Sequence, residues 1–120
     1  MGKVLIVDDA SLIRSVASRA AKEAGHEVVV AEDGAAGLVC AQNDTFDIIF
    51  SDVNMPVMGG LEMVENIKQL DQYKFTPIVM LTTESNDELK AKGKALGAKA
   101  WLLKPFNKDK FLVALEKLLG

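Results

Sequence analysis

The chain has little of what marks several common classes of protein. Among its 120 residues there is one cysteine, Cys40, so no disulfide can form within the chain and a reducing compartment is expected. No apolar run is longer than a few residues, and the start of the chain does not resemble a signal peptide. The formal charge of −3 lacks the positive excess typical of nucleic-acid binders. These absences predict a cytoplasmic protein that binds neither membranes nor nucleic acids.

Motifs for several kinds of chemistry are missing as well. His26 is the only histidine, so no Cys/His zinc cluster is expected, and its place after Gly25 predicts a solvent-facing turn residue. The sequence contains no Walker A loop and no G-x-G-x-x-G motif. No Ser–His or Cys–His nucleophilic pair is evident. Nucleotide-phosphate sites and hydrolases of those kinds are therefore not expected.

The length and composition predict one domain that spans residues 1–120. Apolar residues make up 49% of the chain, which is enough for one hydrophobic core. The charge is divided unevenly along the sequence: residues 1–84 carry a net charge of −7 and residues 85–120 a net charge of +4. This division predicts two regions of the surface with different electrostatic roles.

Strand and helix patterns alternate along the whole chain. Five short apolar runs, rich in β-branched residues, predict strands at residues 4–7, 28–30, 48–50, 78–81 and 101–103. Helical spacing of apolar residues predicts helices at 11–24, 34–43, around 61–67, from 85 onward and at 111–119, the fourth beginning with a capping box of Ser85 and Glu88. Right-handed crossovers between the strands then give an α/β fold with a parallel sheet covered on both faces.

Polar residues follow four of the five predicted strands. Asp8 and Asp9 come after the first, Asp52 after the third, Thr82 after the fourth and Lys104 after the fifth. Each alone has an ordinary explanation as a turn former, a helix cap or a surface group. Together they are expected to converge, because sites in open parallel sheets form at the carboxyl ends of strands.

This set of residues favours magnesium binding and phosphoryl transfer. Three carboxylates brought together repel one another, and a hard divalent cation with oxygen ligands relieves that repulsion, which suits Mg²⁺. An aspartate beside Mg²⁺ and an ammonium group can act as a nucleophile and form an acyl phosphate. Lys104 and Thr82 would then neutralise or hydrogen-bond the phosphoryl oxygens.

Four motifs give the chain a resemblance to a known family. It is similar to the receiver domains of bacterial two-component response regulators, and more narrowly to the single-domain chemotaxis (CheY-like) type. The resemblance runs from Lys3 to Leu119 and rests on Val-Asp-Asp at 7–9, Ser-Asp-Val-Asn-Met-Pro at 51–56, Leu-Thr-Thr-Glu at 81–84 and Lys-Pro-Phe at 104–106. It implies a flavodoxin-like (βα)5 three-layer sandwich with strand order 2-1-3-4-5, an order known for the chemotaxis regulator itself.

The resemblance implies a phosphoacceptor and its metal ligands. Asp52 corresponds to the aspartate that accepts phosphate from a histidine kinase. The Mg²⁺ ligands correspond to Asp9, Asp52 and the backbone oxygen of Asn54, with Asp8 reaching the ion through water. Lys104 corresponds to the lysine that pairs with the phosphoryl group, and the bond between this lysine and the following proline is expected to be cis.

Other positions match residues that tune or transmit the signal. Thr82 corresponds to the switch hydroxyl, while Asn54 and Glu84 occupy positions that set the rate of autodephosphorylation. Trp101 stands where chemotaxis regulators usually have a switch tyrosine. Because indole is larger than phenol, two interpretations stay open: Trp101 rotates inward when Thr82 moves, or it simply packs on Ala98 and the fourth helix.

The resemblance predicts a signalling protein and leaves its output open. A chemotaxis-type histidine kinase would phosphorylate Asp52, and the face formed by the fourth helix, fifth strand and fifth helix would then change its affinity for a protein partner. The flagellar motor switch protein or a phosphatase would be such a partner, and the chain is expected to be monomeric and not an enzyme. The alternatives are a phosphate sink, a phosphorelay receiver, an aspartate-nucleophile Mg²⁺ phosphohydrolase and a flavodoxin-like FMN binder, which Asp8 and Asp9 disfavour.

Overall fold

The computed structural model describes residues 2–84 and 86–119, which form five strands and five α-helices in alternation. The strands are β1 (Lys3–Val7), β2 (Glu27–Ala31), β3 (Ile48–Asp52), β4 (Ile78–Thr82) and β5 (Ala100–Leu103). The helices are α1 (Ser11–Glu23), α2 (Gly34–Asn43), α3 (Gly60–Lys68), α4 (Asp87–Leu96) and α5 (Lys108–Leu119), with a short 3₁₀ turn at Asp71–Tyr73. None of these helices is long and apolar enough to cross a membrane.

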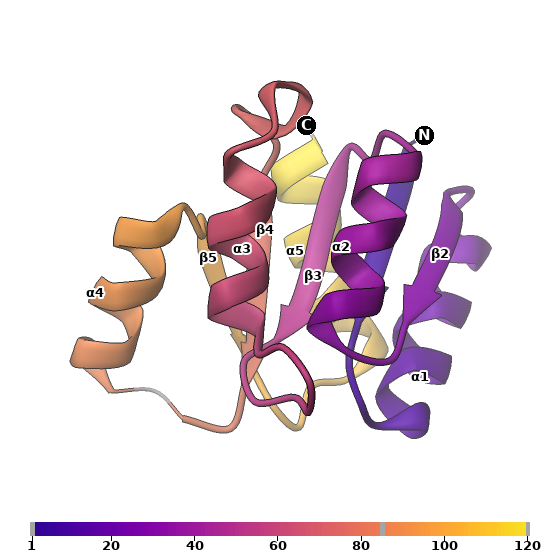
Figure 1. Ribbon diagram of the computed structural model, residues 1–120. Coiled ribbons are helices and arrows are strands. Elements are labelled where there is room, and N and C mark those ends of the chain that lie inside the picture. Colours follow the sequence, from indigo (N-terminus) through magenta and orange to yellow (C-terminus); the bar gives the residue numbers. More distant parts are fainter. Residues whose placement is uncertain (1, 85, 120) are drawn as a thin grey trace.

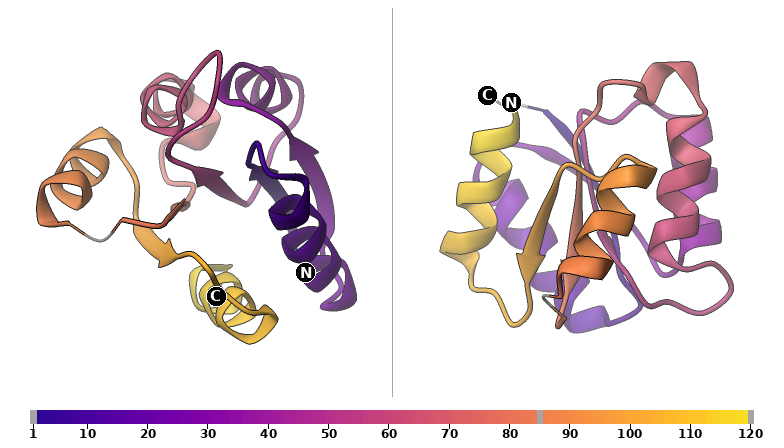
Figure 2. Two further views of the ribbon diagram at one scale, coloured as in Figure 1. Left: turned by 90° about the horizontal axis from the view of Figure 1, so that it is seen from below. Right: turned by 90° about the vertical axis from the view of Figure 1, so that its left-hand side faces the viewer.

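All strand pairs are parallel, and the strand order is β2-β1-β3-β4-β5. Helices α1 and α5 cover one face of the sheet, and α2, α3 and α4 cover the other (Figure 1 and Figure 2). The α/β class, the three layers and the strand order predicted above are therefore confirmed. Every strand ends at the same edge of the sheet, so the loops after the strands lie together at that edge.

The central strands are buried on both faces, as their unbroken apolar runs predict. In β1, Val4 and Ile6 belong to the core beneath α1 and α5, while Leu5 and Val7 belong to the core beneath α2 and α3. Phe50 of β3 packs against Phe111 of α5 with the two rings tilted and their centroids 4.6 Å apart. Successive side chains of one strand thus fill two separate cores, which fixes the register of the sheet.

The start of α4 differs from the expected capping box. The cap is Asn86, whose side chain accepts a hydrogen bond of 2.7 Å from the Leu89 amide, and the helix begins at Asp87. Ser85 lies outside the described residues. Two cap-forming residues stand side by side in the sequence, and the second of them provides the cap.

His26 is buried, so the expectation of a solvent-facing residue is wrong. The residue is 7% exposed; its Nδ1 accepts a hydrogen bond from the Gly2 amide at 3.0 Å, and Nε2 lies 3.2 Å from the Glu116 carboxylate of α5. The turn ends at Gly25, and His26, the next residue, contacts Glu116 near the C-terminal end of α5. A pattern of neighbours in sequence does not show that contact.

The loop between β3 and α3 contains a strained turn at Val57. Its φ of 68° is unusual for a β-branched residue, and the Met58 amide donates a 2.7 Å hydrogen bond to the Pro56 carbonyl across it, which makes a γ-turn. The side chain is 85% exposed, so no burial of Val57 offsets the strain.

Replacing Val57 by asparagine is expected to raise the free energy of unfolding by about 1 kcal/mol, because asparagine tolerates this conformation better. Urea denaturation measures the change. Val113→Asn is the matched control, since Val113 is an exposed valine of α5 without a positive φ, and no gain is expected there. Equal effects at both positions would show that the backbone strain is not the cause.

Candidate functional site

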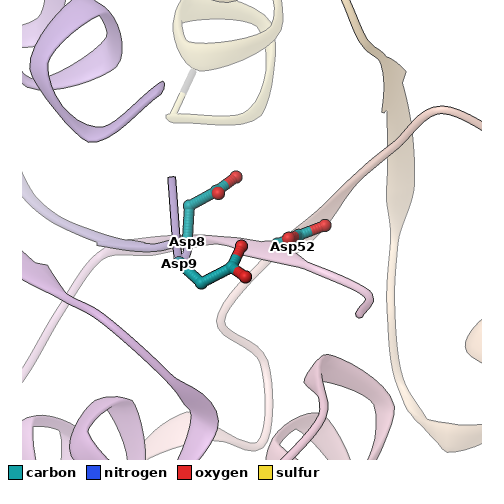
Figure 3. Close-up of side chains that lie close together, drawn as sticks. All are labelled: Asp8, Asp9 and Asp52. Atoms are coloured by element: carbon teal, nitrogen blue, oxygen red, sulfur yellow. The ribbon is translucent and has the colours of Figure 1, made fainter. Parts of the chain in front are cut away.

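Three carboxylates meet at the edge of the sheet where the strands end. Asp8 and Asp9 follow β1, Asp52 is the last residue of β3, and one oxygen of each lies within 4.8 Å of the others (Figure 3). Asp8 is fully buried and Asp52 is 8% exposed, whereas Asp9 is open to solvent. The convergence predicted from the strand ends is therefore observed for all three.

Lys104 joins this cluster from the end of β5. Its ammonium nitrogen lies 2.7 Å from Asp8 Oδ2 and 3.3 Å from Asp52 Oδ1. Asp8 Oδ2 has no directed hydrogen bond among the described residues, so the buried oxygen is held by this ion pair alone. The Lys104–Pro105 peptide bond is cis, as the resemblance implied.

The charges in the cluster shift one another's pKa values. Burial first, and repulsion from the Asp8 carboxylate second, raise the pKa of Asp52 from 3.8 to about 6, although Lys104 acts in the opposite direction. Burial alone would lower the pKa of Lys104, but contacts with Asp8 and Asp52 outweigh it and raise the pKa overall. The lysine therefore stays charged at neutral pH, while Asp52 is close to its titration point.

The loop after β1 is held by contacts that the sequence did not reveal. Asp8 Oδ1 accepts a hydrogen bond of 2.9 Å from the Ala10 amide, and the Arg14 guanidinium donates one of 2.7 Å to the Asp8 carbonyl. Arg14 lies in the first turn of α1, where the helix dipole disfavours a positive charge. That unfavourable placement was the available signal that Arg14 has a specific partner.

The backbone around Asp52 is packed against the first residue of α3. The Gly60 amide donates a 2.8 Å hydrogen bond to the Val53 carbonyl, and a Cβ on Gly60 would lie 1.9 Å from the Asp52 carbonyl oxygen. The Ser51 hydroxyl donates a 2.9 Å hydrogen bond to the same Asp52 carbonyl. Gly60 therefore allows the close approach that places Asp52 at the edge of the sheet.

The remaining predicted residues make no hydrogen bond to the cluster within the described part of the chain. Thr82 is buried at the end of β4, and its hydroxyl accepts a 3.0 Å hydrogen bond from the Glu84 amide. Glu84 and Asn54 are both exposed, and the Glu84 carboxylate accepts a hydrogen bond from the Asn86 side chain. Among the described residues, no hydrogen bond links Thr82, Asn54 or Glu84 to the carboxylates. Trp101 of β5 points toward α4 and lies against Gly93.

The cluster suits a hard divalent cation. Its ligand atoms are all carboxylate oxygens, which Mg²⁺ prefers, and the exposed Asp9 leaves the site open on one side. Asp8 Oδ2 is buried and has only the Lys104 ammonium as a partner in the described part of the chain, so it keeps a lone pair with which to bind a further group. Receiver domains bind Mg²⁺ at an acidic pocket of this kind.

A parallel sheet in this order, with an acidic cluster and a lysine at the ends of its strands, defines the class of receiver domains. The family model described as "Response regulator receiver domain" matches residues 4–116, and the chain belongs to this family. Receiver domains are signalling domains.

Several relatives carry chemotaxis or motility names. The chain is 35% identical to Protein PilG of Pseudomonas aeruginosa, covering 95% of this chain and 84% of the relative. It is 30% identical to Chemotaxis protein CheY-3 of Vibrio cholerae, covering 97% and 90% respectively. The solved structure of the chemotaxis response regulator CheY4 of Vibrio cholerae is 52% identical and has a TM-score of 0.95, with 98% of each chain covered. Two of these three relatives are therefore named as chemotaxis proteins.

Metal-free protein is expected to lose stability through Asp52 as the pH rises. The pKa of Asp52 is about 6 in the folded protein and near 3.8 in the unfolded chain, so the folded state holds the proton more tightly between these values. The free energy of unfolding of the wild type should therefore fall, relative to Asp52→Asn, by about 1–3 kcal/mol as the pH rises from about 4 to about 7.

Urea denaturation in the presence of a chelator, at a series of pH values, measures this difference. Added Mg²⁺ is expected to remove much of it at neutral pH, because the ion binds the ionised carboxylates of the folded wild type. Parallel curves for the two proteins across this pH range would show that Asp52 titrates normally in the folded state.

Proposed function

We propose that this receiver domain accepts a phosphoryl group on Asp52 from a histidine kinase and thereby switches its affinity for a protein partner. The observation that carries the proposal is the single ammonium of Lys104 between the buried Asp8 and Asp52, beside the exposed Asp9. An ionised aspartate held in this way can act as a nucleophile. The positive charge of Lys104 beside it would neutralise the oxygens of the incoming phosphoryl group.

The chain's own groups support each part of the transfer. Asp52 must be ionised, so that a carboxylate oxygen attacks the phosphorus of phosphohistidine; a P–O bond forms, the P–N bond breaks, and the histidine nitrogen leaves with the electron pair. We expect Lys104, which lies 3.3 Å from Asp52 Oδ1, to pair with a phosphoryl oxygen, and the Thr82 hydroxyl can donate as well as accept. The metal, when bound by Asp9, Asp52 and the Asn54 carbonyl, with Asp8 acting through water, supplies neutralisation of the phosphoryl charge.

We further propose that Asn54 and Glu84 set the lifetime of the phosphorylated state. Both side chains are exposed and follow the strands that carry Asp52 and Thr82, and we expect them to flank the path by which water reaches the acceptor. The chain would release its own phosphate in this way without turning over other substrates. It is therefore proposed to be a switch and not an enzyme; as expected from the sequence, we also propose that it is monomeric and cytoplasmic.

Treatment with acetyl phosphate and Mg²⁺ tests the acceptor. Wild-type protein should gain one acid-labile phosphate, seen by intact-mass measurement, and Asp52→Asn should gain essentially none. Asp71→Asn is the matched control, because Asp71 is an exposed aspartate in the 3₁₀ turn. Equal labelling of the wild type and the Asp52→Asn variant would rule out Asp52 as the acceptor, and repeated turnover of small phosphate esters would favour a phosphohydrolase.

The output is proposed to be a chemotaxis-type protein contact through α4, β5 and α5. Lys94 is exposed and Lys90 half-buried on α4, so an acidic segment of the partner would fit this face. Binding to a flagellar motor switch protein should strengthen when beryllofluoride and Mg²⁺ are added, and charge reversal at Lys90 and Lys94 should weaken binding without slowing phosphorylation. Phosphorylation without any change in this binding would favour a phosphate sink or a phosphorelay receiver.

A further inference from the structure

Helix α4 has few apolar contacts to hold it on the sheet. Gly93 is its only buried residue within Asp87–Leu96, and Leu89 and Leu96 are half-buried. Most of the other residues of the helix are exposed. The helix stands at the side of the molecule beside β5 (Figure 1 and Figure 2). Its position therefore depends on a small number of contacts.

One of these contacts joins Gly93 to Trp101. A Cβ on Gly93 would lie 2.4 Å from Cζ2 and 3.0 Å from Cη2 of the indole, so the edge of the ring rests directly on the backbone of α4. Trp101 pairs with Met80 in the sheet and packs against the buried core that includes Ala98. The indole thus fills the space between β5 and α4, and any side chain larger than hydrogen at Gly93 would displace it.

Backbone conformation does not explain the glycine. The described glycines with positive φ are Gly25 and Gly97, whereas Gly93 lies inside a regular helix, where glycine is among the least favourable residues. An unfavourable residue at a position that touches the indole indicates that the contact itself is the reason for the glycine.

We infer that Trp101 is a fixed peg that holds α4 on the sheet, with Gly93 as its socket, and that the indole does not rotate when Asp52 is phosphorylated. Outward rotation would empty the socket and take the indole away from Gly93, the only residue of Asp87–Leu96 that is buried. The output face would then change without movement of the indole. The statement about the output face rests on the proposed function, whereas the peg and socket do not.

Melting temperatures of a double-mutant cycle test the peg and socket. Gly93→Ala in the wild type should lower the melting temperature by about 5 °C or more, because the methyl group displaces the indole. In a Trp101→Ala background the same change should raise it by about 2–5 °C, because only the higher helix propensity of alanine remains. A change of the same sign in both backgrounds would overturn the inference. Ala91→Gly, at an exposed site of α4, controls for helix propensity.

Fluorescence of Trp101, the only tryptophan, tests whether the peg moves. Quenching by acrylamide should stay within about 20% of its starting value when beryllofluoride and Mg²⁺ are added to the wild type, because one position of the indole persists. A change of about twofold would show a rotating side chain and overturn that part. Binding of beryllofluoride is followed separately by fluorine NMR with Asp52→Asn as the blank. Failure to bind beryllofluoride would count against the proposed function. The melting temperatures would still test whether Trp101 and Gly93 hold α4 on the sheet.

Discussion

Replacing Lys104 by methionine is expected to destabilise the metal-free protein by about 3–5 kcal/mol at neutral pH, because one partner of a buried ion pair is removed. Asp8 is fully buried, and its Oδ2 has only the Lys104 ammonium opposite it in the described part of the chain. Asp52 would lose the same positive charge. Methionine keeps the length of the side chain, so the change tests the charge more than the packing.

Two comparisons separate the loss of charge from a packing defect. The double variant Asp8→Asn with Lys104→Met removes both members of the closest pair and should recover a large part of the lost stability. Lys110→Met, at an exposed site of α5, should have almost no effect. Urea denaturation with a chelator gives all the values, and a double variant no more stable than Lys104→Met alone would attribute the loss to packing.

Conditions that lower the negative charge of the site should also restore the stability of the Lys104→Met protein. The pKa of Asp52 is already raised by burial and by Asp8, and loss of the opposing lysine raises it further. Protonation at lower pH then relieves part of the repulsion, and saturating Mg²⁺ should do so at neutral pH. If neither change reduces the difference from the wild type, repulsion between carboxylates is not its cause.

The elements of the fold were predictable because each depends on neighbours in sequence. The strands at 4–7 and 78–81 are found in the structure at Lys3–Val7 and Ile78–Thr82, since unbroken β-branched runs are typical of strands covered on both faces. The expected helix at 34–43 matches α2 at both ends. Polar residues directly after such strands were therefore assigned correctly to one edge of the sheet.

Features that depend on contacts across space were not predictable in the same way. His26 follows a turn signal, but its burial is decided by Gly2 and by Glu116, which is 90 residues further along the chain. No sequence pattern marked Gly60 or Gly93 as a point of close contact. The sequence shows that these positions are small and cannot show which atoms of the folded chain come close to them.

Among substitutions at these positions of close contact, Gly60→Ala is expected to have the largest effect on stability and phosphorylation. Its Cβ would lie 1.9 Å from the Asp52 carbonyl oxygen and 3.0 Å from the carbonyl carbon, both of which are backbone atoms that cannot turn aside. We expect a loss of about 3 kcal/mol of stability, because either the end of β3 or the start of α3 must move. Asp52 would move with the strand, so phosphorylation by acetyl phosphate should slow by about tenfold or more even where the protein stays folded.

The neighbouring glycine supplies the control for this prediction. A Cβ on Gly59 would come no closer than 3.4 Å to the Val53 carbonyl oxygen, which is ordinary contact, so Gly59→Ala should cost less than about 1 kcal/mol and leave the labelling rate nearly unchanged. Denaturation curves and the time course of labelling, measured at a temperature where both variants are folded, give the two quantities. If Gly60→Ala matched Gly59→Ala in both, the close packing of α3 under Asp52 would not be what positions the phosphoacceptor.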